Sequence, residues 1–325
     1  MAVIAVRGSK SESGLRPFDP YRDVEAVVDL ITMAFGDQLD VIARRSLEAM
    51  RRSARGGHLL PMVVPRELLF EPGFVWLDQG RMVGNISLRR ATVGWGGFLI
   101  GNVAVHPDWR GRGIGRALME AAFEEILSRG GYWAGLEVRQ DNVAAVNLYH
   151  NLEFQAVGRT CRMLRPSGQP WQGDAPQFEG LRRGRHADGA AVCDLLSRLV
   201  PLSHRILLEV RERDYRIGWE DQLDRWLAGQ RVAWWVIEER GQVVAGVRSL
   251  YTTPRRLGQI EVLIDPARVG RYEEVLVRQG MAGLSTTSAW LETTLPVQNE
   301  DLGEAFLRAG FRDAYTLVQM RLDLR

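Results

Sequence analysis

Hydrophobic and polar positions along the first half of the chain follow a pattern that predicts a mixed α/β unit. Short apolar runs bounded by turn residues predict strands over residues 15–18, 74–78, 82–92, 98–105, 135–138 and 156–164. Apolar positions at helical spacing predict helices over residues 24–35, 39–55, 113–128 and 142–151. Gly130 and Gly131 follow the third helix and predict its C-cap, because glycine tolerates the left-handed conformation found there.

The second half of the chain repeats this pattern in the same order. The matching segments are 14–18 with 180–184, 75–84 with 236–246, 103–107 with 262–266, and 148–154 with 305–311. Matches in a constant order predict duplication of one unit. Residues 166–176 contain three prolines and little periodicity, so they are expected to form an extended linker. The predicted domains are therefore residues 1–167 and 178–325.

Length and composition agree with two ordinary globular domains. The chain has 325 residues, of which 46% are hydrophobic and 25% charged, and its net charge is only +2. Such a small charge gives no general attraction to nucleic acid. The two cysteines, Cys161 and Cys193, are too few for a disulfide framework. No signal peptide or membrane span is expected, so we expect a cytoplasmic protein, either a monomer or a homodimer, without a membrane partner.

The basic residues are almost all arginines, and this excludes several enzyme classes. Lys10 is the only lysine among 42 basic residues. P-loop enzymes, protein kinases and pyridoxal enzymes each need a lysine in a defined context that Lys10 does not have. The five histidines are scattered, and no Cys-x-x-Cys is present, so no metal site is expected.

The segment from residue 103 to 119 carries the chemical signal. A buried strand ends at Pro107, and a loop with glycines at 111, 113 and 115 leads into a helix. Glycines let the backbone approach a ligand, and a helix N-terminus attracts anions, so the loop is suited to a pyrophosphate. A dinucleotide fingerprint would need glycine at position 116, where Arg116 stands.

The segment resembles the GNAT superfamily of acyl-CoA-dependent N-acetyltransferases. The family's Arg/Gln-x-x-Gly-x-Gly/Ala motif is met by residues 110–115, and Asn142 and Tyr149 follow Glu137 by five and twelve residues. This second pattern is similar to the branch that acetylates the N-terminal alanine of ribosomal protein S18. Glu153 departs from the glycine usual in the family, which bears on local geometry. The resemblance implies two tandem GNAT-like domains, each a mixed, mostly antiparallel twisted sheet flanked by helices.

The resemblance also implies roles for particular residues. Acetyl-CoA would be the cosubstrate, with no metal. Tyr149 would donate a proton to the departing thiolate, and Glu137 would be the general base, through a water. His106 is a poorer candidate, because it lies in a turn before Pro107. The implied cofactor-binding residues are the strand residues Val103, Ala104 and Val105, the loop residues Arg110, Gly111, Arg112, Gly113, Ile114, Gly115 and Arg116, and Asn142.

The second unit lacks the features that carry this chemistry. Its segment 265–274 has one glycine and places Glu273 and Glu274 at the expected helix start, where they would repel a pyrophosphate. Phe306 occupies the position of Tyr149 and cannot donate a proton. We therefore expect residues 178–325 to keep the fold without catalysis.

The sequence favours an N-acetyltransferase that moves an acetyl group from acetyl-CoA to a primary amine by direct attack. The acceptor is either a small molecule or a peptide N-terminus. A non-catalytic acyl-CoA-binding sensor or interaction module is the alternative. Mycothiol synthases are also tandem GNAT proteins, but their active unit is the C-terminal one, which is opposite to the pattern here.

Overall fold

The chain forms two compact units. The computed structural model describes residues 13–55, 71–168, 170–218, 225, 228–253, 256–297 and 299–324. The first unit comprises residues 1–137, 143–155 and 320–325, and the second comprises residues 138–142 and 156–319. Each unit therefore includes a short piece of chain from the other half of the sequence. No helix among the described residues is long and apolar enough to cross a bilayer.

The first unit is built on five strands in the order β1-β2-β3-β4-β5. All neighbouring pairs are antiparallel except β4 and β5, which are parallel. The strands are β1 (Gly14–Pro17), β2 (Glu71–Asp78), β3 (Arg81–Arg90), β4 (Gly97–Val105) and β5 (Trp133–Arg139). The helices are α1 (Val24–Phe35), α2 (Val41–Arg55), α4 (Ile114–Ser128) and α5 (Val143–His150).

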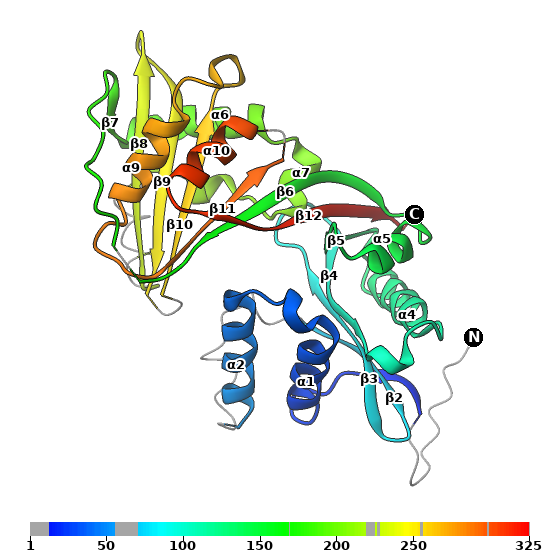
Figure 1. Cartoon of the computed structure of the whole chain (residues 1–325). Helices are drawn as coiled ribbons and strands as arrows, with labels where there is room; N and C mark the ends of the chain where they lie inside the picture. Colours follow the sequence, from blue (N-terminus) through cyan, green and yellow to red (C-terminus); the bar gives the residue numbers. More distant parts are fainter. Residues whose placement is uncertain are drawn as a thin grey trace. The chain divides into compact units, whose positions relative to one another are not determined.

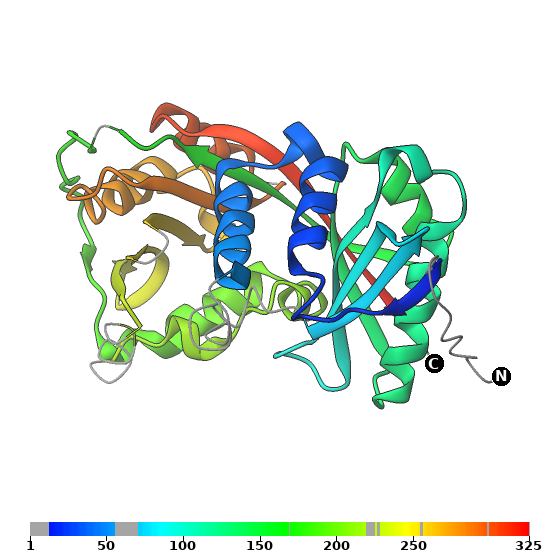
Figure 2. The same ribbon diagram turned by 90° about the horizontal axis from the view of Figure 1, so that it is seen from below.

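Helices cover both faces of this sheet (Figures 1 and 2). The apolar stripe of α1 buries Val27, Leu30 and Ile31 against Val75 and Ala104 on one face. Helix α4 packs on the other face, where a Cβ at Gly84 would lie 2.9 Å from Ile114 and 3.1 Å from Leu118. Gly84 therefore allows α4 to approach the sheet closely.

The second unit repeats this architecture. Its strand order is β7-β8-β9-β10-β11-β6-β12. Strands β10 and β11 are parallel, and the pairs β7–β8, β8–β9, β9–β10 and β11–β6 are antiparallel. The strands are β6 (Gln155–Arg165), β7 (Leu181–Arg183), β8 (Gln230–Glu239), β9 (Gln242–Thr252), β10 (Leu257–Ile264), β11 (Trp290–Pro296) and β12 (Arg312–Asp323). The helices are α6 (Gly189–Leu199), α7 (Leu202–Leu207), α9 (Glu273–Ala282) and α10 (Glu300–Arg308).

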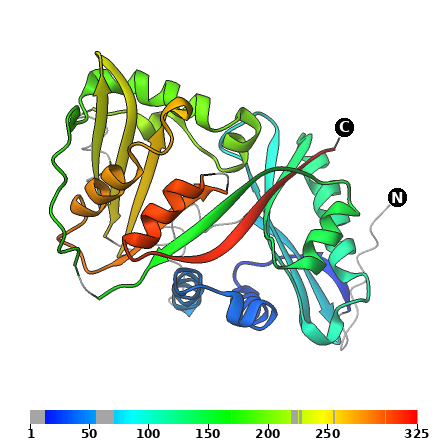
Figure 3. The ribbon, with the colours of Figure 1, turned by 45° about the horizontal axis from the view of Figure 1, so that its top comes forward.

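Two apolar clusters lie on opposite faces of the second sheet. On one face α9 and α10 bury Leu276 and Phe306 against Val247. On the other face α6 buries Val192 and Leu195 in a second cluster. Figure 3 shows α9 and α10 on one side of the strands and α6 on the other.

Matching local contacts support the duplication. Arg16 pairs with Asp23 before α1, and Arg182 pairs with Asp188 before α6. The predicted fold class, a tandem arrangement of mixed sheets flanked by helices, is thus confirmed. Each strand and helix expected between residues 14 and 165 is present, with bounds that shift by no more than three residues.

Candidate active site

Strand β4 contains a bulge in the middle of the first sheet. Ser87 of β3 pairs with Gly101 and Asn85 pairs with Ala104, so two steps along β3 oppose three along β4. Asn102 adopts a left-handed backbone with φ of 52°. A bulge leaves one residue unpaired and bends its strand.

A pair of asparagines holds this bulge. The Asn85 side chain, only 1% exposed, donates from Nδ2 to the carbonyl oxygen of Asn102 at 2.9 Å. Asn102 in turn donates from its own Nδ2 to Oγ of Ser87 at 3.3 Å. Sequence reasoning missed all three residues. The available signal was an asparagine inside an apolar strand, which is unusual because asparagine is depleted in strands.

Strands β4 and β5 separate next to the bulge. Their parallel ladder runs from the pair Gly97–Trp133 to the pair Ile100–Leu136. Beyond that pair, the described residues of β4 pair only with β3. Val103 and Ala104 therefore have no ladder partner on β5, and the cofactor-binding role expected for them stays a prediction.

The glycine loop, residues 111–116, follows β4 and opens into α4. Gly111 and Gly113 have φ of 76° and 80°, and a Cβ on either would meet no atom within 4 Å. Gly113 is the N-cap of α4, and no side chain caps this helix end. The first N–H groups of α4 thus receive no capping side chain from the N-cap residue, and helix starts of this kind can bind phosphate groups.

All three predicted arginines have partners close to the loop. Arg112 donates to the carbonyl oxygen of Asp108 at 2.9 Å. Arg110 donates to the carbonyl oxygen of Ala34 at 2.8 Å and to that of Val105 at 3.3 Å. Arg116 lies 3.8 Å from Glu120 in the next turn of α4. These arginines add positive charge around the loop.

The turn before the loop is braced by an aromatic and cationic cluster. The ring of Trp109 lies 5.0 Å from the guanidinium of Arg81 and 5.6 Å from that of Arg112. Its indole N–H donates to Asp78 at 2.7 Å. Buried His106 meets Trp109 edge-on, and its Nε2 lies 2.7 Å from Arg81. His106 therefore acts in the framework of the turn.

Tyr149 is placed by the end of α5. Its side chain is 5% exposed, and its ring lies 5.8 Å from that of Phe154. The chain turns back here because Phe154 N–H donates to the carbonyl oxygen of Tyr149 at 3.0 Å, with Glu153 in a left-handed conformation at φ 68°. Burial raises the pKa of the Tyr149 hydroxyl well above its ordinary value of 10. The phenol therefore keeps its proton at neutral pH.

Glu137 and Asn142 lie on the segment that joins β5 to α5. The Glu137 side chain is exposed near the end of β5. Asn142 is half-buried directly before α5, and its N–H donates to the carbonyl oxygen of Arg139 at 3.0 Å. Arg139 forms an ion pair with Asp141 at 2.7 Å. Asn142 groups with the second unit and Glu137 with the first, and their predicted roles stay predictions.

The corresponding strand of the second unit has no bulge. Strand β10 pairs with β9 in an unbroken register from Leu257–Thr252 to Ile264–Ala245. The peptide N–H groups of His106 and Asp265 donate to Val83 and Val244 respectively, both at 2.9 Å. Counting two residues on from this matched pair places Gly246 at the position of Asn85. The clamp that holds the β4 bulge is therefore missing from β9.

The helix start of the second unit is filled by the chain itself. Glu273, 5% exposed, accepts hydrogen bonds from the N–H groups of Gly270 at 2.8 Å and Tyr272 at 3.0 Å. Its carboxylate thus takes up N–H groups of the kind that a phosphate would use. Phe306, which is fully buried, packs on Phe311 at 4.9 Å, as Tyr149 packs on Phe154 in the first unit.

No group of three or more His, Cys, Asp or Glu side chains suited to a metal ion occurs among the residues described above.

Comparison with known sequences identifies the class of protein. Residues 48–154 match the acetyltransferase (GNAT) family. The chain is 47% identical over 53 residues to the [ribosomal protein bS18]-alanine N-acetyltransferase of Escherichia coli K12, which is 16% of this chain and 36% of that protein. It is 44% identical over 71 residues to the N-alpha-acetyltransferase RimI of Mycobacterium tuberculosis, which is 22% of this chain and 43% of that protein. The match thus spans well under half the length of these relatives.

Comparison with solved structures extends the likeness to the whole chain. A GCN5-related N-acetyltransferase from Sphaerobacter thermophilus has a TM-score of 0.62 at 17% identity, covering 96% of this chain and 95% of that one. A tandem GNAT protein from the clavulanic acid biosynthesis pathway has a TM-score of 0.58 at 15% identity, covering 97% and 99%. These likenesses show the fold. The chain contains an acetyltransferase domain of the GNAT family within a tandem GNAT fold.

Proposed function

We propose that the first unit transfers an acetyl group from acetyl-CoA to a primary amine by direct attack. The observation that carries this proposal is the bulged, separated edge of β4 next to the open N-terminus of α4. An extended backbone edge suits a pantetheine arm, and a helix start suits the pyrophosphate at the end of that arm. Membership of the GNAT family supports acetyl transfer to an amine.

The glycine loop fits the pyrophosphate group of the cosubstrate. Gly111 and Gly113 leave open space where side chains would stand, and their left-handed backbone conformation is of the kind that forms anion-binding loops. The remaining predicted residues of the loop, Arg110, Arg112, Ile114, Gly115 and Arg116, supply either the first turn of α4 or positive charge beside it. Phosphate oxygens would thus meet backbone donors within a positively charged surround.

The strand beside the loop would bind the acyl-bearing part of the cosubstrate. Backbone groups of Val103, Ala104 and Val105 would hold the pantetheine arm and polarise the acyl carbonyl. Asn142 would add a polar contact to the arm. Polarisation of the carbonyl makes its carbon open to attack by a neutral amine.

Proton transfers complete the reaction. As the amine nitrogen bonds to the acyl carbon and the carbon–sulfur bond breaks, Tyr149 donates its proton to the departing thiolate. Glu137 accepts the proton of the amine through a water. The Tyr149 phenol is protonated at neutral pH, so its proton is available when the thiolate forms.

We assign the second unit a non-catalytic role, as we expected from the sequence for residues 178–325. Its β10 has an unbroken ladder, Glu273 occupies its helix start, and Phe306 lacks a hydroxyl. The first difference concerns the binding of the pantetheine arm, the second the binding of the pyrophosphate, and the third the general acid. One acetyl-CoA is therefore expected per chain.

The experiment measures CoA release with a panel of amines, using wild type and Tyr149→Phe. Alanine-terminated peptides belong in the panel, because the E. coli relative is named for an alanine of ribosomal protein bS18. Small-molecule amines form the other arm. Turnover by wild type with a loss of at least about 10²-fold in kcat for the variant supports the proposal. Binding of acetyl-CoA without turnover on any amine would instead establish the sensor alternative.

A further inference from the structure

Residues 139–142, from the last residue of β5 to the start of α5, form a turn that is held by its first side chain. Arg139 donates to both carboxylate oxygens of Asp141, from Nε at 3.0 Å and from Nη2 at 2.7 Å. Its guanidinium also lies over the ring of Tyr315 of β12, at 4.7 Å from the ring centroid. The turn and Tyr315 both belong to the second unit. One aromatic side chain of β12 therefore contacts the turn that ends at Asn142.

Tyr315 is itself anchored through its hydroxyl group. The hydroxyl oxygen accepts a hydrogen bond from Nη1 of Arg162 at 2.9 Å. Arg162 forms an ion pair with Glu292, which is only 7% exposed, and Gln259 donates a further hydrogen bond to that carboxylate. Gln259 and Glu292 form the last residue pair of the parallel ladder between β10 and β11. The Tyr315 ring is therefore held from the buried part of the second sheet.

The backbone around this turn has a counterpart in the other half of the chain. Extending the sequence match between α5 and α10 without a gap pairs Gln140 with Val297, and Thr316 with Arg159. The N–H of Gln140 donates to the carbonyl oxygen of Thr316 at 2.9 Å. In the counterpart, the N–H of Val297 donates to the carbonyl oxygen of Arg159 at 3.3 Å. The backbone link between the turn and the neighbouring strand is therefore common to both halves.

The stack of Arg139 on Tyr315 has no such counterpart. The same extension pairs Arg139 with Pro296, and Tyr315 with Gly158, and neither residue can take part in a cation–π contact. The space beside Gly158 is taken by the ring of His204, whose Cε1 would lie 2.4 Å from a Cβ at that position. Both partners of the stack are thus replaced together although the backbone link is kept. The stack is therefore an addition to the shared framework, at the turn of the half that carries the cofactor motif.

We propose that Tyr315 is a positioning residue of the acetyltransferase site and acts through Arg139 on Asn142. The inference rests on the function proposed above, in which Asn142 contacts the pantetheine arm. The N–H of Asn142 donates to the carbonyl oxygen of Arg139 at 3.0 Å, so a displacement of Arg139 also displaces Asn142. A cation–π contact restrains the guanidinium and with it the turn. The second unit thus has a role in acetyl-CoA binding that needs no cofactor motif of its own.

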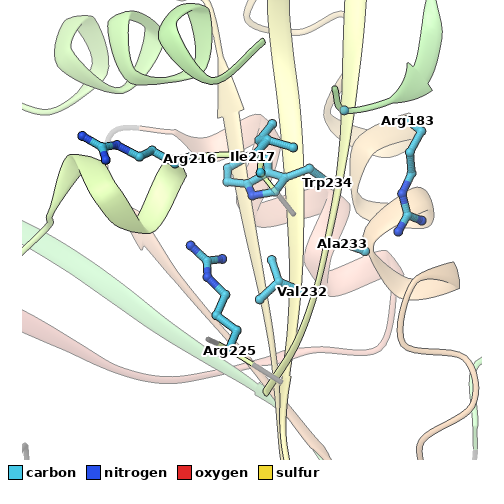
Figure 4. Close-up of a pocket in the computed structure, with 9 residues that line it drawn as sticks. Arg183, Arg216, Ile217, Arg225, Val232, Ala233 and Trp234 are labelled. Atoms are coloured by element: carbon cyan, nitrogen blue, oxygen red, sulfur yellow. The ribbon is translucent and has the colours of Figure 1, made fainter. Parts of the chain in front are cut away.

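The stack is separate from the small pocket beside β8. That pocket is lined by residues 232–234 of β8, the end of β7, residues 216–218 and Arg225 (Figure 4). Its described lining includes neither Tyr315 nor the residues that contact it. A change in acetyl-CoA binding caused by a substitution of Tyr315 is therefore assigned to the turn and not to this pocket.

The test is calorimetric titration of the full chain with acetyl-CoA. Tyr315→Leu removes the ring and keeps an apolar side chain, whereas Tyr315→Phe keeps the ring and removes only the hydroxyl group. Tyr251→Leu is the matched control in the same unit, because the guanidinium of Arg231 lies 5.0 Å from the ring of Tyr251. We expect Tyr315→Leu to bind acetyl-CoA about three- to tenfold more weakly, as for the loss of about one hydrogen bond. Tyr315→Phe should bind more tightly than Tyr315→Leu, and the control should bind as wild type does.

Two further measurements separate positioning from a general loss of stability. In the CoA-release assay, the KM for acetyl-CoA should rise in Tyr315→Leu by the same factor, while kcat stays equal to that of Tyr251→Leu. Arg139→Gln removes the other partner of the stack, and it tests the same contact if melting curves show that Tyr315→Leu is unfolded. Residues that act through one contact are not additive, so the double variant should bind no more weakly than the weaker single variant.

Each outcome decides the role of Tyr315. Unchanged affinity in Tyr315→Leu, an equal loss in Tyr251→Leu, or additive losses in the double variant overturn the positioning role. Wild type that binds acetyl-CoA but releases no CoA with any amine refutes the proposed acetyl transfer, and the affinities of the variants still decide whether Tyr315 positions the turn. Wild type that does not bind acetyl-CoA overturns both proposals.

Discussion

Replacing Asn85 with alanine removes the amide that holds the bulge of β4. The change breaks the 2.9 Å hydrogen bond to the carbonyl oxygen of Asn102 at a side chain that is 1% exposed. A buried carbonyl left without its donor costs about 1–3 kcal/mol. For a unit of about 150 residues, each kcal/mol lowers Tm by roughly 2–4 °C.

The kinetic effect should exceed what this loss of stability explains. The left-handed backbone of Asn102, at φ 52°, is unfavourable by itself and depends on the contacts that surround it. When the bulge relaxes, the backbone of Val103 and Ala104 shifts relative to the acyl carbonyl. Misplacement by about 1 Å can cost about 10²-fold in rate. We expect kcat to fall by about 10- to 100-fold, with little change in KM for the amine.

The control is Ser249→Ala in the second unit. Ser249 is also 1% exposed, and its Oγ donates to the carbonyl oxygen of Gly280 at 2.8 Å. The two variants lose the same kind of bond, so their melting temperatures should fall by comparable amounts. Only Asn85→Ala should lose kcat in the CoA-release assay. Equal kcat values for both variants and wild type would refute the role given to the bulge.

Three further predictions concern single side chains. Glu153→Gly should stabilise the chain by less than about 1 kcal/mol and raise Tm slightly, because glycine accepts the φ of 68° found there. A lowered Tm in thermal unfolding would contradict this. Glu273→Gln should lower the stability of the second unit by about 0.5–2 kcal/mol in denaturant unfolding and leave acetyl-CoA stoichiometry at one per chain by calorimetry. Burial lowers the pKa of His204 below its ordinary 6.5, so the unfolded chain binds a proton that the folded chain does not. The free energy of unfolding should therefore be independent of this group above about pH 6.5 and decrease as the pH drops below it. In His204→Gln the free energy of unfolding should decrease less steeply over the same pH range. The same pH dependence in wild type and variant would exclude this assignment.

Much of the fold followed from local sequence signals. The residue pairs Gln79–Gly80 and Arg240–Gly241 form the turns of two hairpins, with positive φ at both positions. Two strands joined by a two-residue turn that contains glycine are typical of a hairpin. Gly130, at φ 75°, directly follows Arg129, the C-cap of α4, one residue before the position where the sequence predicted the cap. These features depend on neighbours within a few positions, and periodicity therefore sufficed to find them.

The bulge could not be predicted in the same way. It depends on an amide of β3 and a carbonyl of β4 that lie 17 residues apart and meet only after the two strands pair. The hydrogen bond from Arg110 to Ala34 also depends on the tertiary fold, since the two residues lie 76 positions apart in the sequence. The sequence showed which positions of the loop carry arginine, whereas the orientation of the Arg110 guanidinium is decided by this tertiary contact.

The structure also changes how the two units should be compared. Sequence similarity matched Gly84 with Gly246, but the hydrogen bonds of Val83 and Val244 place Gly246 at the position of Asn85. Strand β4 has one residue more than β3 between Gly101 and Ala104, whereas β10 pairs with β9 residue for residue. A substitution such as Phe306→Tyr would restore a hydroxyl without restoring this extra residue. The unbroken β10 ladder and the Glu273 carboxylate would remain. The two units therefore differ in the backbone of the strand and in the cap of the helix, and not only in the tyrosine hydroxyl.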